Sequence, residues 1–358
     1  MKNGKVEILV INPGSTSTKV AYYQEDVCIV KENLVHQAAL LSAYHSIWEQ
    51  IDLRREVIEE FLKRNDILKE ALDAVVTRGG HTRPLSGGIY YINEVMLAES
   101  ASEKFGNHAC DLGLILAKRF EQYGAKPLTA YTPVTDEFEP LARYSGLPEI
   151  RRRSCFHALN HKGAAHYHAG QVGKRYEDMN LVVAHMGGGI SVAAHRHGQM
   201  VDANNALTGD GPFSTNRSGG LPIGDLIEAC FSGNCTQAEM MRRVNGTGGM
   251  MAYVGDNDLL TVEQRANAGE SVCAEVIEAM GYQTAKEIGA YAAVLDGAVD
   301  AILLTGGMAN SEKLTGFITE KVRFIAPVVK YPGEFEMRAL AQSALSVLDG
   351  TQTPRVIE

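Results

Sequence analysis

The chain lacks several features that would assign it to a class at once. Its 358 residues contain no run apolar enough to span a membrane and no signal-peptide pattern, and the six cysteines form no Cys-x-x-Cys pair. Positive charge is not in excess either, because 34 lysines and arginines stand against 43 aspartates and glutamates, a net charge of −9. These absences argue against a membrane protein, a disulfide framework and a nucleic-acid-binding surface. We therefore expect a soluble, cytoplasmic protein that binds a small molecule.

Two common nucleotide-binding motifs are also missing. No Gly-x-Gly-x-x-Gly run occurs, so a dinucleotide-binding fold has no support. The stretch ILVINPGSTSTKVAYY (8–23) lacks the second glycine of a P-loop, and after Lys19 it continues as a strand. What remains is a strand-turn-strand hairpin at Gly14, whose backbone N–H groups and hydroxyls can bind phosphate oxygens. Taken alone, an ordinary polar hairpin is an equally good interpretation.

Strand-like and helical patterns alternate along the chain, which indicates the α/β class. Residues 9–30 and 181–201 share one plan, in which an apolar strand, a small-residue turn, a second apolar strand, a polar turn and a third strand follow one another. Two copies half a chain apart predict a duplicated fold in two domains. We expect these domains to span 1–155 and 156–333, without a low-complexity linker between them.

Glycine-rich turns recur on both halves and favour nucleotide binding. The second hairpin contains HMGGGIS, with Gly187, Gly188 and Gly189 where the backbone must come close to another group. A third turn, LTGGMAN with Gly306 and Gly307, follows another apolar strand. Phosphate hairpins on two domains, together with a glycine platform for adenosine, describe duplicated actin-like ATPase domains of the ribonuclease H-like type with a nucleotide cleft between them.

Longer blocks make the resemblance more specific. The stretches INPGSTSTK, RGG (78–80), SGLPEIRRRSCFHALN, HMGGGIS, GDGPFSTNRSGGLPIGDL and VDAILLTGG resemble the butyrate kinases of the acetokinase family, in order from about Val6 to Leu348. The resemblance implies that butanoate and ATP, with Mg²⁺, give butanoyl phosphate and ADP. Branched-chain fatty acids, acetate and propionate are alternative substrates. It also implies a homo-oligomer, and a C-terminal helix at 334–350 that completes the first domain.

The implied reaction needs anion-binding groups more than a base, because a carboxylate nucleophile is already ionised at neutral pH. By resemblance, Arg78 and Arg217 are expected to hold the substrate carboxylate and the transferring phosphoryl group, as suits the guanidinium fork. His157 is expected to donate to the phosphoryl oxygens, and His108 to lie near the carboxylate. Arg83 is a weaker candidate.

The remaining site positions follow from the same resemblance. Predicted nucleotide- and phosphate-binding residues are Asn12, Gly14, Ser15, Ser17, Lys19, Gly187, Gly188, Gly189, Asp256, Gly306 and Gly307. Asn12 and Glu334 are the predicted metal positions, with Glu336 as an alternative acid. Phe156 and Phe213 are the expected walls of an apolar acyl pocket.

One alternative concerns a metal other than magnesium. His157 and His161 are spaced i, i+4, with His166 and His168 downstream, a spacing that could serve zinc. Since no cysteine or acid completes a recognisable zinc pattern, we favour the phosphoryl-transfer interpretation.

One departure from the resemblance supports a second hypothesis. Butyrate kinases carry V-D-P-V-V-V-D-E where this chain reads AYTPVTDEFEP, so Tyr131 or Thr132 stands where an aspartate is expected. Asp136 matches the second acid of that stretch. A catalytically impaired, nucleotide-binding homologue is therefore the alternative to an active kinase.

Overall fold

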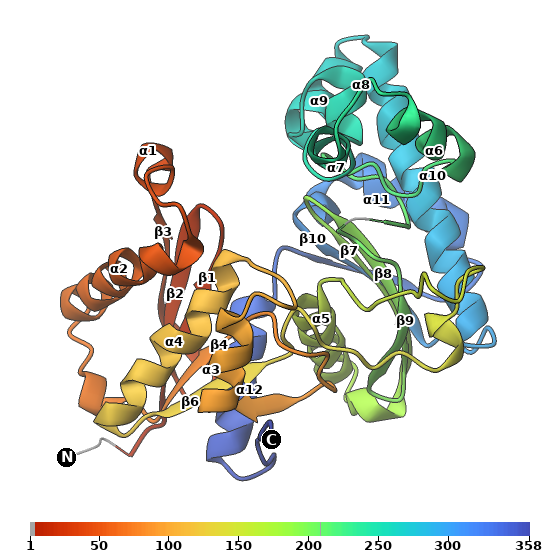
Figure 1. Cartoon of the computed structure of the whole chain (residues 1–358). Coiled ribbons are helices and arrows are strands. Elements are labelled where there is room, and N and C mark those ends of the chain that lie inside the picture. Colours follow the sequence, from red (N-terminus) through yellow and green to blue (C-terminus); the bar gives the residue numbers. More distant parts are fainter. Residues whose placement is uncertain (1–3, 208) are drawn as a thin grey trace. The chain divides into compact units, whose positions relative to one another are not determined.

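The computed structural model describes residues 4–207 and 209–358, which divide into two compact units (Figure 1). Unit 1 comprises the chain up to Asp136 together with Phe335–Glu358, and unit 2 comprises Glu137–Glu334. The first boundary thus precedes the position near 155 that the sequence suggested. The reason is that Glu137 binds Lys162, with 2.9 Å from Nζ to Oε1, and that the Glu139 N–H donates to Val201 O, so this stretch packs on unit 2.

Unit 1 contains a six-stranded sheet in the order β3-β2-β1-β4-β6-β5. The strands β1, β2 and β3 form an antiparallel meander, β4 and β6 extend the sheet parallel to β1, and β5 is antiparallel to β6. The strand bounds are β1 Glu7–Pro13, β2 Ser17–Gln24, β3 Val27–Val35, β4 Ala74–Thr77, β5 Ile89–Tyr91 and β6 Lys126–Ala130. The α-helices are α1 Ala38–Leu41, α2 Ile51–Arg64, α3 Glu94–Ala101, α4 Leu112–Lys118 and α12 Glu336–Leu348, and the 3₁₀ helices are η1 Ile47–Gln50, η2 Lys69–Ala71, η3 Ala109–Asp111 and η4 Arg119–Tyr123.

The apolar run of β1 is buried on both faces, as expected for a strand in the middle of a covered sheet. Leu9 and Ile11 join the hydrophobic cluster that contains Ile58 of α2 and Leu112 and Leu114 at the start of α4. Side chains alternate along a strand, so the next polar residue, Asn12, points to the opposite face, where α12 packs against β1 and β4.

Unit 2 repeats this plan in a five-stranded sheet of order β11-β10-β7-β8-β9. The strands β7, β8 and β9 form the meander, and β10 and β11 extend it parallel to β7. The strand bounds are β7 Asn180–Met186, β8 Ile190–Arg196, β9 Gln199–Ala203, β10 Ala301–Gly306 and β11 Val328–Pro332. The helices are α5 Ala158–Gln171, α10 Ser271–Val294, α11 Glu312–Val322, η5 Leu141–Arg143, η6 Tyr176–Asp178 and η7 Gly307–Asn310. The duplicated sheet confirms the internal repeat seen in the sequence.

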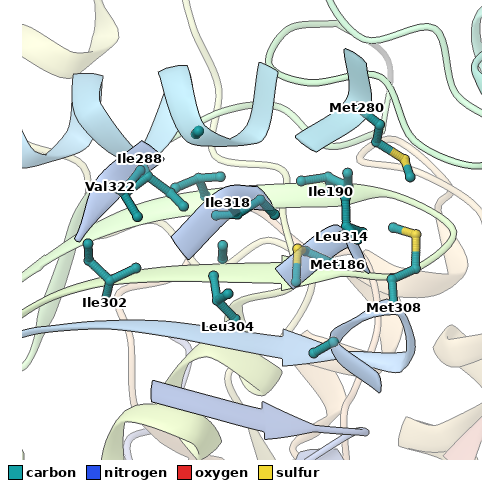
Figure 2. Close-up of a cluster of buried hydrophobic side chains, with 14 of the residues drawn as sticks. Met186, Ile190, Met280, Ile288, Ile302, Leu304, Met308, Leu314, Ile318 and Val322 are labelled. Carbon is teal, nitrogen blue, oxygen red and sulfur yellow. The ribbon is translucent and has the colours of Figure 1, made fainter. Parts of the chain in front are cut away.

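The main core of unit 2 lies between its sheet and the pair α10 and α11 (Figure 2). Met186 and Leu304, from β7 and β10, face Ile288 of α10 and Leu314 and Ile318 of α11. Each is at most 1% exposed, so each contributes roughly 1.5 to 3 kcal/mol through burial of its side chain. This core fixes the ends of β7 and β10, from which the glycine-rich turns extend.

Four further helices follow β9 and precede α10 in the sequence, and they gather around one end of α10 (Figure 1). They are α6 Ile223–Phe231, α7 Gln237–Val244, α8 Met250–Val254 and α9 Leu259–Asn267. This insertion was not predicted from the sequence. The helices are at most nine residues long, which is shorter than the stretch over which a helical pattern of apolar residues can be recognised.

Candidate functional site

The first phosphate-hairpin candidate is the turn between β1 and β2. Gly14 N–H donates to Ser17 O over 2.7 Å, Ser15 is exposed at the turn, and Lys19 lies on β2 opposite Asn12. Arg54 of α2 is fully buried and binds the end of the turn, because its Nη1 donates to Ser17 O over 3.1 Å. Burial lowers the pKa of Arg54 to about 10. Arg54 could not be predicted from the sequence, because a polar residue on a helix gives no sign of the hairpin that it contacts.

A compact polar cluster forms where β1, β4 and the first turn of α12 meet. Asn12 Nδ2 donates to Glu336 Oε2 over 2.7 Å, and Arg78 Nη1 donates to Glu336 Oε1 over 3.4 Å. Burial by itself would lower the pKa of Arg78, but Glu336 and the Cys110 thiol more than offset it, so the pKa is raised. The Nε of Arg78 is buried without a hydrogen-bond partner. The structure therefore joins Asn12 and Arg78 to Glu336, the alternative acid, whereas Glu334 lies in unit 2.

The RGG motif is shaped by the buried carboxylate of Asp111. A Cβ at Gly80 would lie 2.6 Å from Asp111 Oδ1, so only glycine lets the backbone pass. The carboxylate accepts from His81 N–H over 2.8 Å, from His81 Nδ1 over 2.9 Å and from His108 N–H over 2.9 Å. The RGG loop and the start of η3 are thus held by one side chain.

His108, predicted to lie near the substrate carboxylate, caps η3 in the structure. Its Nδ1 accepts from the Cys110 N–H over 3.2 Å. The hydrogen bond to Asp111 raises the pKa of His81 to about 10. Burial would raise the pKa of Cys110, but hydrogen bonds from His108 and His81 and the charge of Arg78 together lower it to about 7.

The glycine-rich turns of unit 2 lie at the carboxyl ends of β7 and β10. Gly187 N–H donates to Gly189 O over 3.1 Å, which closes the turn between β7 and β8. Gly306 pairs with Gly333 by two backbone hydrogen bonds of 3.0 Å, and Gly307 opens η7. These turns lie at the edge of the sheet where ligands of α/β proteins bind.

Arg217 is tied to the same turn through Ser214. Ser214 Oγ donates to Gly188 O over 2.6 Å and accepts from the Arg217 N–H over 3.2 Å. The guanidinium Nη1 donates to Ala206 O over 2.5 Å, and its Nε is buried without a partner. Burial lowers the pKa of Arg217, which still leaves the side chain charged.

Replacing Gly189 by alanine is expected to destabilise the protein by about 1 to 3 kcal/mol. A Cβ there would overlap Arg217 Nη1 and lie 2.8 Å from Ala206 O, whereas at Gly188 the nearest atom would be 3.9 Å away. Gly188→Ala is therefore the matched control, with an expected change within about 0.5 kcal/mol. Urea unfolding of both variants measures the difference, and equal midpoints would contradict this account.

His157 lies just before α5 and is held from two sides. Its Nδ1 is 2.8 Å from Ser191 Oγ on β8, and its ring stacks on His185 with 4.1 Å between centroids. His185 Nδ1 in turn lies 2.8 Å from Asn160 Nδ2. The imidazole of His157 is therefore fixed in position by α5, β7 and β8 of unit 2.

Three predicted residues lie elsewhere in unit 2. Asp256 stands in the helical insertion, where its Oδ1 accepts from the Asp258 N–H over 2.9 Å. Phe213 belongs to the main core, whereas Phe156 packs against a separate small cluster with Phe138. The two expected pocket walls therefore belong to different clusters. A hollow of about 310 Å³, between α2 and η4 of unit 1, is lined by neither of them.

The histidines of α5 do not gather as metal ligands. Within residues 4–207 and 209–358, the group whose ligand atoms come together is His81, Cys110 and Asp111, all within 4.8 Å of one another. These atoms already bind one another, since His81 Nδ1 and Cys110 Sγ lie 2.9 Å and 3.7 Å from Asp111 Oδ1.

Thr132, one of the two positions where the sequence analysis expected an aspartate, is 2% exposed. Its Oγ1 is buried without a hydrogen-bond partner, and its methyl group lies beside Gly79 of the RGG motif. The preceding residue, Tyr131, has a φ of +46°, so the chain turns sharply at this point.

Comparison with known proteins identifies the family. Residues 144–328 match the model of the acetokinase family. Butyrate kinase 2 of Clostridium acetobutylicum is 47% identical over 349 residues, which cover 97% of this chain and 98% of that protein. A protein named probable butyrate kinase from Listeria innocua is 46% identical over 351 residues, 98% of this chain and 99% of the relative.

Solved structures give the fold. Acetate kinase of Porphyromonas gingivalis superposes with a TM-score of 0.77 at 19% identity, over 96% of this chain and 100% of that one. A propionate kinase of Francisella tularensis superposes with 0.74 at 20% identity, over 94% and 98%. The duplicated sheets therefore have the actin-like ATPase fold. In the described part of the chain, no helix has the length and apolar character needed to cross a bilayer. The match to the family model and the near full-length relatives show that the chain belongs to the acetokinase family.

Proposed function

We propose that this protein transfers the γ-phosphoryl group of ATP to butanoate, giving butanoyl phosphate and ADP. The near full-length relatives named butyrate kinase support this substrate. The structural observation that carries the proposal is the set of guanidinium groups, because Arg78 and Arg217 each keep a buried Nε without a partner beside a glycine-rich turn. Such N–H groups suit planar anions. Assembly as a cytoplasmic homo-oligomer is part of the proposal, and light scattering tests the assembly.

The chemistry explains why these residue types suffice. A carboxylate nucleophile needs no base, so catalysis rests on aligning two anions and stabilising charge on the transferring group. We assign Arg78 and Arg217 to these anions, and His157 to the phosphoryl oxygens as a hydrogen-bond donor. The turns at Gly14, Gly187–Gly189 and Gly306–Gly307 are assigned to the nucleotide, together with Asp256.

The donor set also fits Mg²⁺. Hard divalent cations prefer oxygen ligands and keep several waters, which suits Asn12 and a carboxylate at the start of α12. Glu336, bonded to Asn12, fits this role better than Glu334. When bound, Mg²⁺ offsets the negative charge of the triphosphate.

The deciding experiment traps acyl phosphate as hydroxamate from ATP, Mg²⁺ and a series of acids. The series runs from acetate and propionate through isobutyrate, butyrate and valerate to phenylacetate. Turnover that peaks at four carbons supports the proposal, and a peak at two or three carbons would assign an acetate or propionate kinase instead. The kcat/KM values of acids that differ by one carbon should differ by no more than about 200-fold, because one methylene in an apolar pocket contributes only about 1 to 3 kcal/mol.

A second candidate function is nucleotide binding with little catalysis, favoured by Thr132. Replacing Thr132 by aspartate is expected to raise Mg²⁺-dependent turnover, because a carboxylate would then stand beside the RGG motif. The same change is expected to lower stability by about 1 to 3 kcal/mol, since the position is buried. Thr132→Asn, which is similar in size and uncharged, is the control. Unchanged turnover in Thr132→Asp would count against an acid at this position.

A further inference from the structure

A continuous row of hydrogen bonds runs inward from His157 through unit 2. Ser191 Oγ lies 2.8 Å from both His157 Nδ1 and His161 Nε2. His161 Nδ1 is 3.3 Å from His195 Nε2, and His195 Nδ1 is 2.8 Å from the Tyr176 hydroxyl. We call these five residues the histidine chain.

The fold brings the histidine chain together by simple periodicity. Ser191 and His195 each lie two positions from Ala193 along β8, so all three face the same side of the sheet. His161 on α5 packs on that side, while Ile190 and Val192 face the opposite core with α10 and α11. Helix α5 therefore presents polar side chains to a polar row on β8.

The inner members of the histidine chain carry hydrogen bonds and no charge. His161 and His195 are fully buried, and burial lowers the pKa of each well below 6.5. The nearby Lys162 ammonium is paired with Glu137 over 2.8 Å and lies over the Tyr176 ring, so it also disfavours protonation of His195. A neutral imidazole has one donor nitrogen and one acceptor nitrogen, so the direction of one bond fixes the next.

That direction is set at the inner end. A phenol is the more acidic donor and an imidazole nitrogen the stronger acceptor, so the Tyr176 O–H donates to His195 Nδ1. His195 Nε2–H then donates to His161 Nδ1, and His161 Nε2–H to Ser191 Oγ. The Ser191 hydroxyl proton is left to donate to His157 Nδ1.

We propose that Ser191, His161, His195 and Tyr176 are positioning residues that hold His157 in the neutral form protonated at Nε2. His157 then carries its single ring proton at Nε2, the nitrogen that would donate to the phosphoryl oxygens, and no proton has to move during phosphoryl transfer. The role of this donor in the reaction rests on the proposed function, whereas the protonation pattern of His157 does not.

The test combines nuclear magnetic resonance with kinetics on the full chain. Histidine labelled with ¹⁵N reports whether each ring nitrogen is protonated, and the signals missing in His157→Gln identify His157. The wild-type protein should show a protonated Nε2 and a bare Nδ1. Tyr176→Phe should mix the two tautomers of His157 and lower kcat about tenfold, the effect of one net hydrogen bond, with the KM for ATP within about twofold.

Tyr331→Phe is the matched control, because it also removes a tyrosine hydroxyl, 2.9 Å from His168 Nδ1, but outside the histidine chain. It should leave the His157 signals and kcat unchanged. Ser191→Ala should give the same mixing of tautomers if Tyr176→Phe folds poorly. A protonated Nδ1 in the wild type, or an unmixed Nε2–H in both variants, would overturn the inference. If the wild type phosphorylates no carboxylate, the proposed function fails, but the tautomer measurement still decides whether His157 is protonated at Nε2.

Discussion

Replacing Arg78 by lysine is expected to lower kcat for acyl phosphate formation by about 10²- to 10³-fold, the effect of losing one preorganised donor to developing charge. Arg78 is held by Glu336 over 3.4 Å at the end of β4, so its planar fork is preorganised. A lysine ammonium can replace the charge but not the fork, and its flexible stem loses more entropy on binding. The measurement is initial rate against ATP and butanoate in the hydroxamate assay.

Arg55→Lys is the matched control for this prediction. Arg55 lies on α2 in the same unit, pairs with surface carboxylates such as Asp52 at 3.2 Å, and is 35% exposed. The same chemical change there should leave kcat within about twofold, because exposed ion pairs contribute about 0 to 1 kcal/mol. If Arg78→Lys retains more than half of the wild-type kcat while remaining folded, Arg78 does not act on the reacting anions.

The duplicated fold could be predicted because it is repeated in local patterns. The meanders at 9–30 and 181–201 became β1–β3 and β7–β9. The boundary near 155 differs from the structure because the residues from Glu137 onward are polar but bonded to unit 2, and spacing along the chain does not show such contacts. Tertiary packing thus decided what local propensity left open.

Some parts of the candidate site could also be predicted from local sequence patterns, whereas others depend on tertiary packing. The glycine-rich turns can be recognised in the sequence from their composition. The structure places Gly187–Gly189 and Gly306 at strand ends, as the pattern indicated. The pairing of Asn12 with Glu336 joins residues 324 positions apart, and no local signal reports it. The i, i+4 spacing of His157 and His161 indicated that these two members of the histidine chain are neighbours. The link between them through Ser191 depends on how α5 packs on β8 and could not be predicted from the sequence.

Replacing Asp111 by asparagine is expected to lower the free energy of unfolding by about 3 to 5 kcal/mol. Asp111 is fully buried and accepts hydrogen bonds from two backbone N–H groups and one imidazole. The amide NH₂ group of asparagine cannot accept a hydrogen bond, so at least one of these donors loses its acceptor. The His81 imidazole also loses the negative charge of the carboxylate. Asp52→Asn, at a side chain that is 74% exposed, is the control and should cost less than about 1 kcal/mol.

The pH dependence supplies an independent check. Because the pKa of folded His81 is raised to about 10 from an ordinary 6.5, its contribution to stability is full below pH 6.5 and is lost as the pH rises through 10. Cys110, whose pKa is lowered to about 7, acts in the opposite direction, so both proteins are compared in a Cys110→Ala background.

In that background, the protein with Asp111 should lose stability between pH 6.5 and 10, and Asp111→Asn should lose much less over the same interval. Urea unfolding at several pH values measures both curves. Parallel curves would mean that the bond between His81 and Asp111 does not carry the stability of the RGG loop. The loop would then depend on the tight fit of Gly80 alone, and loss of Asp111 would not disturb Arg78. A steeper curve for the protein with Asp111 would instead tie the position of Arg78 to a buried ion pair that lies outside the reacting groups.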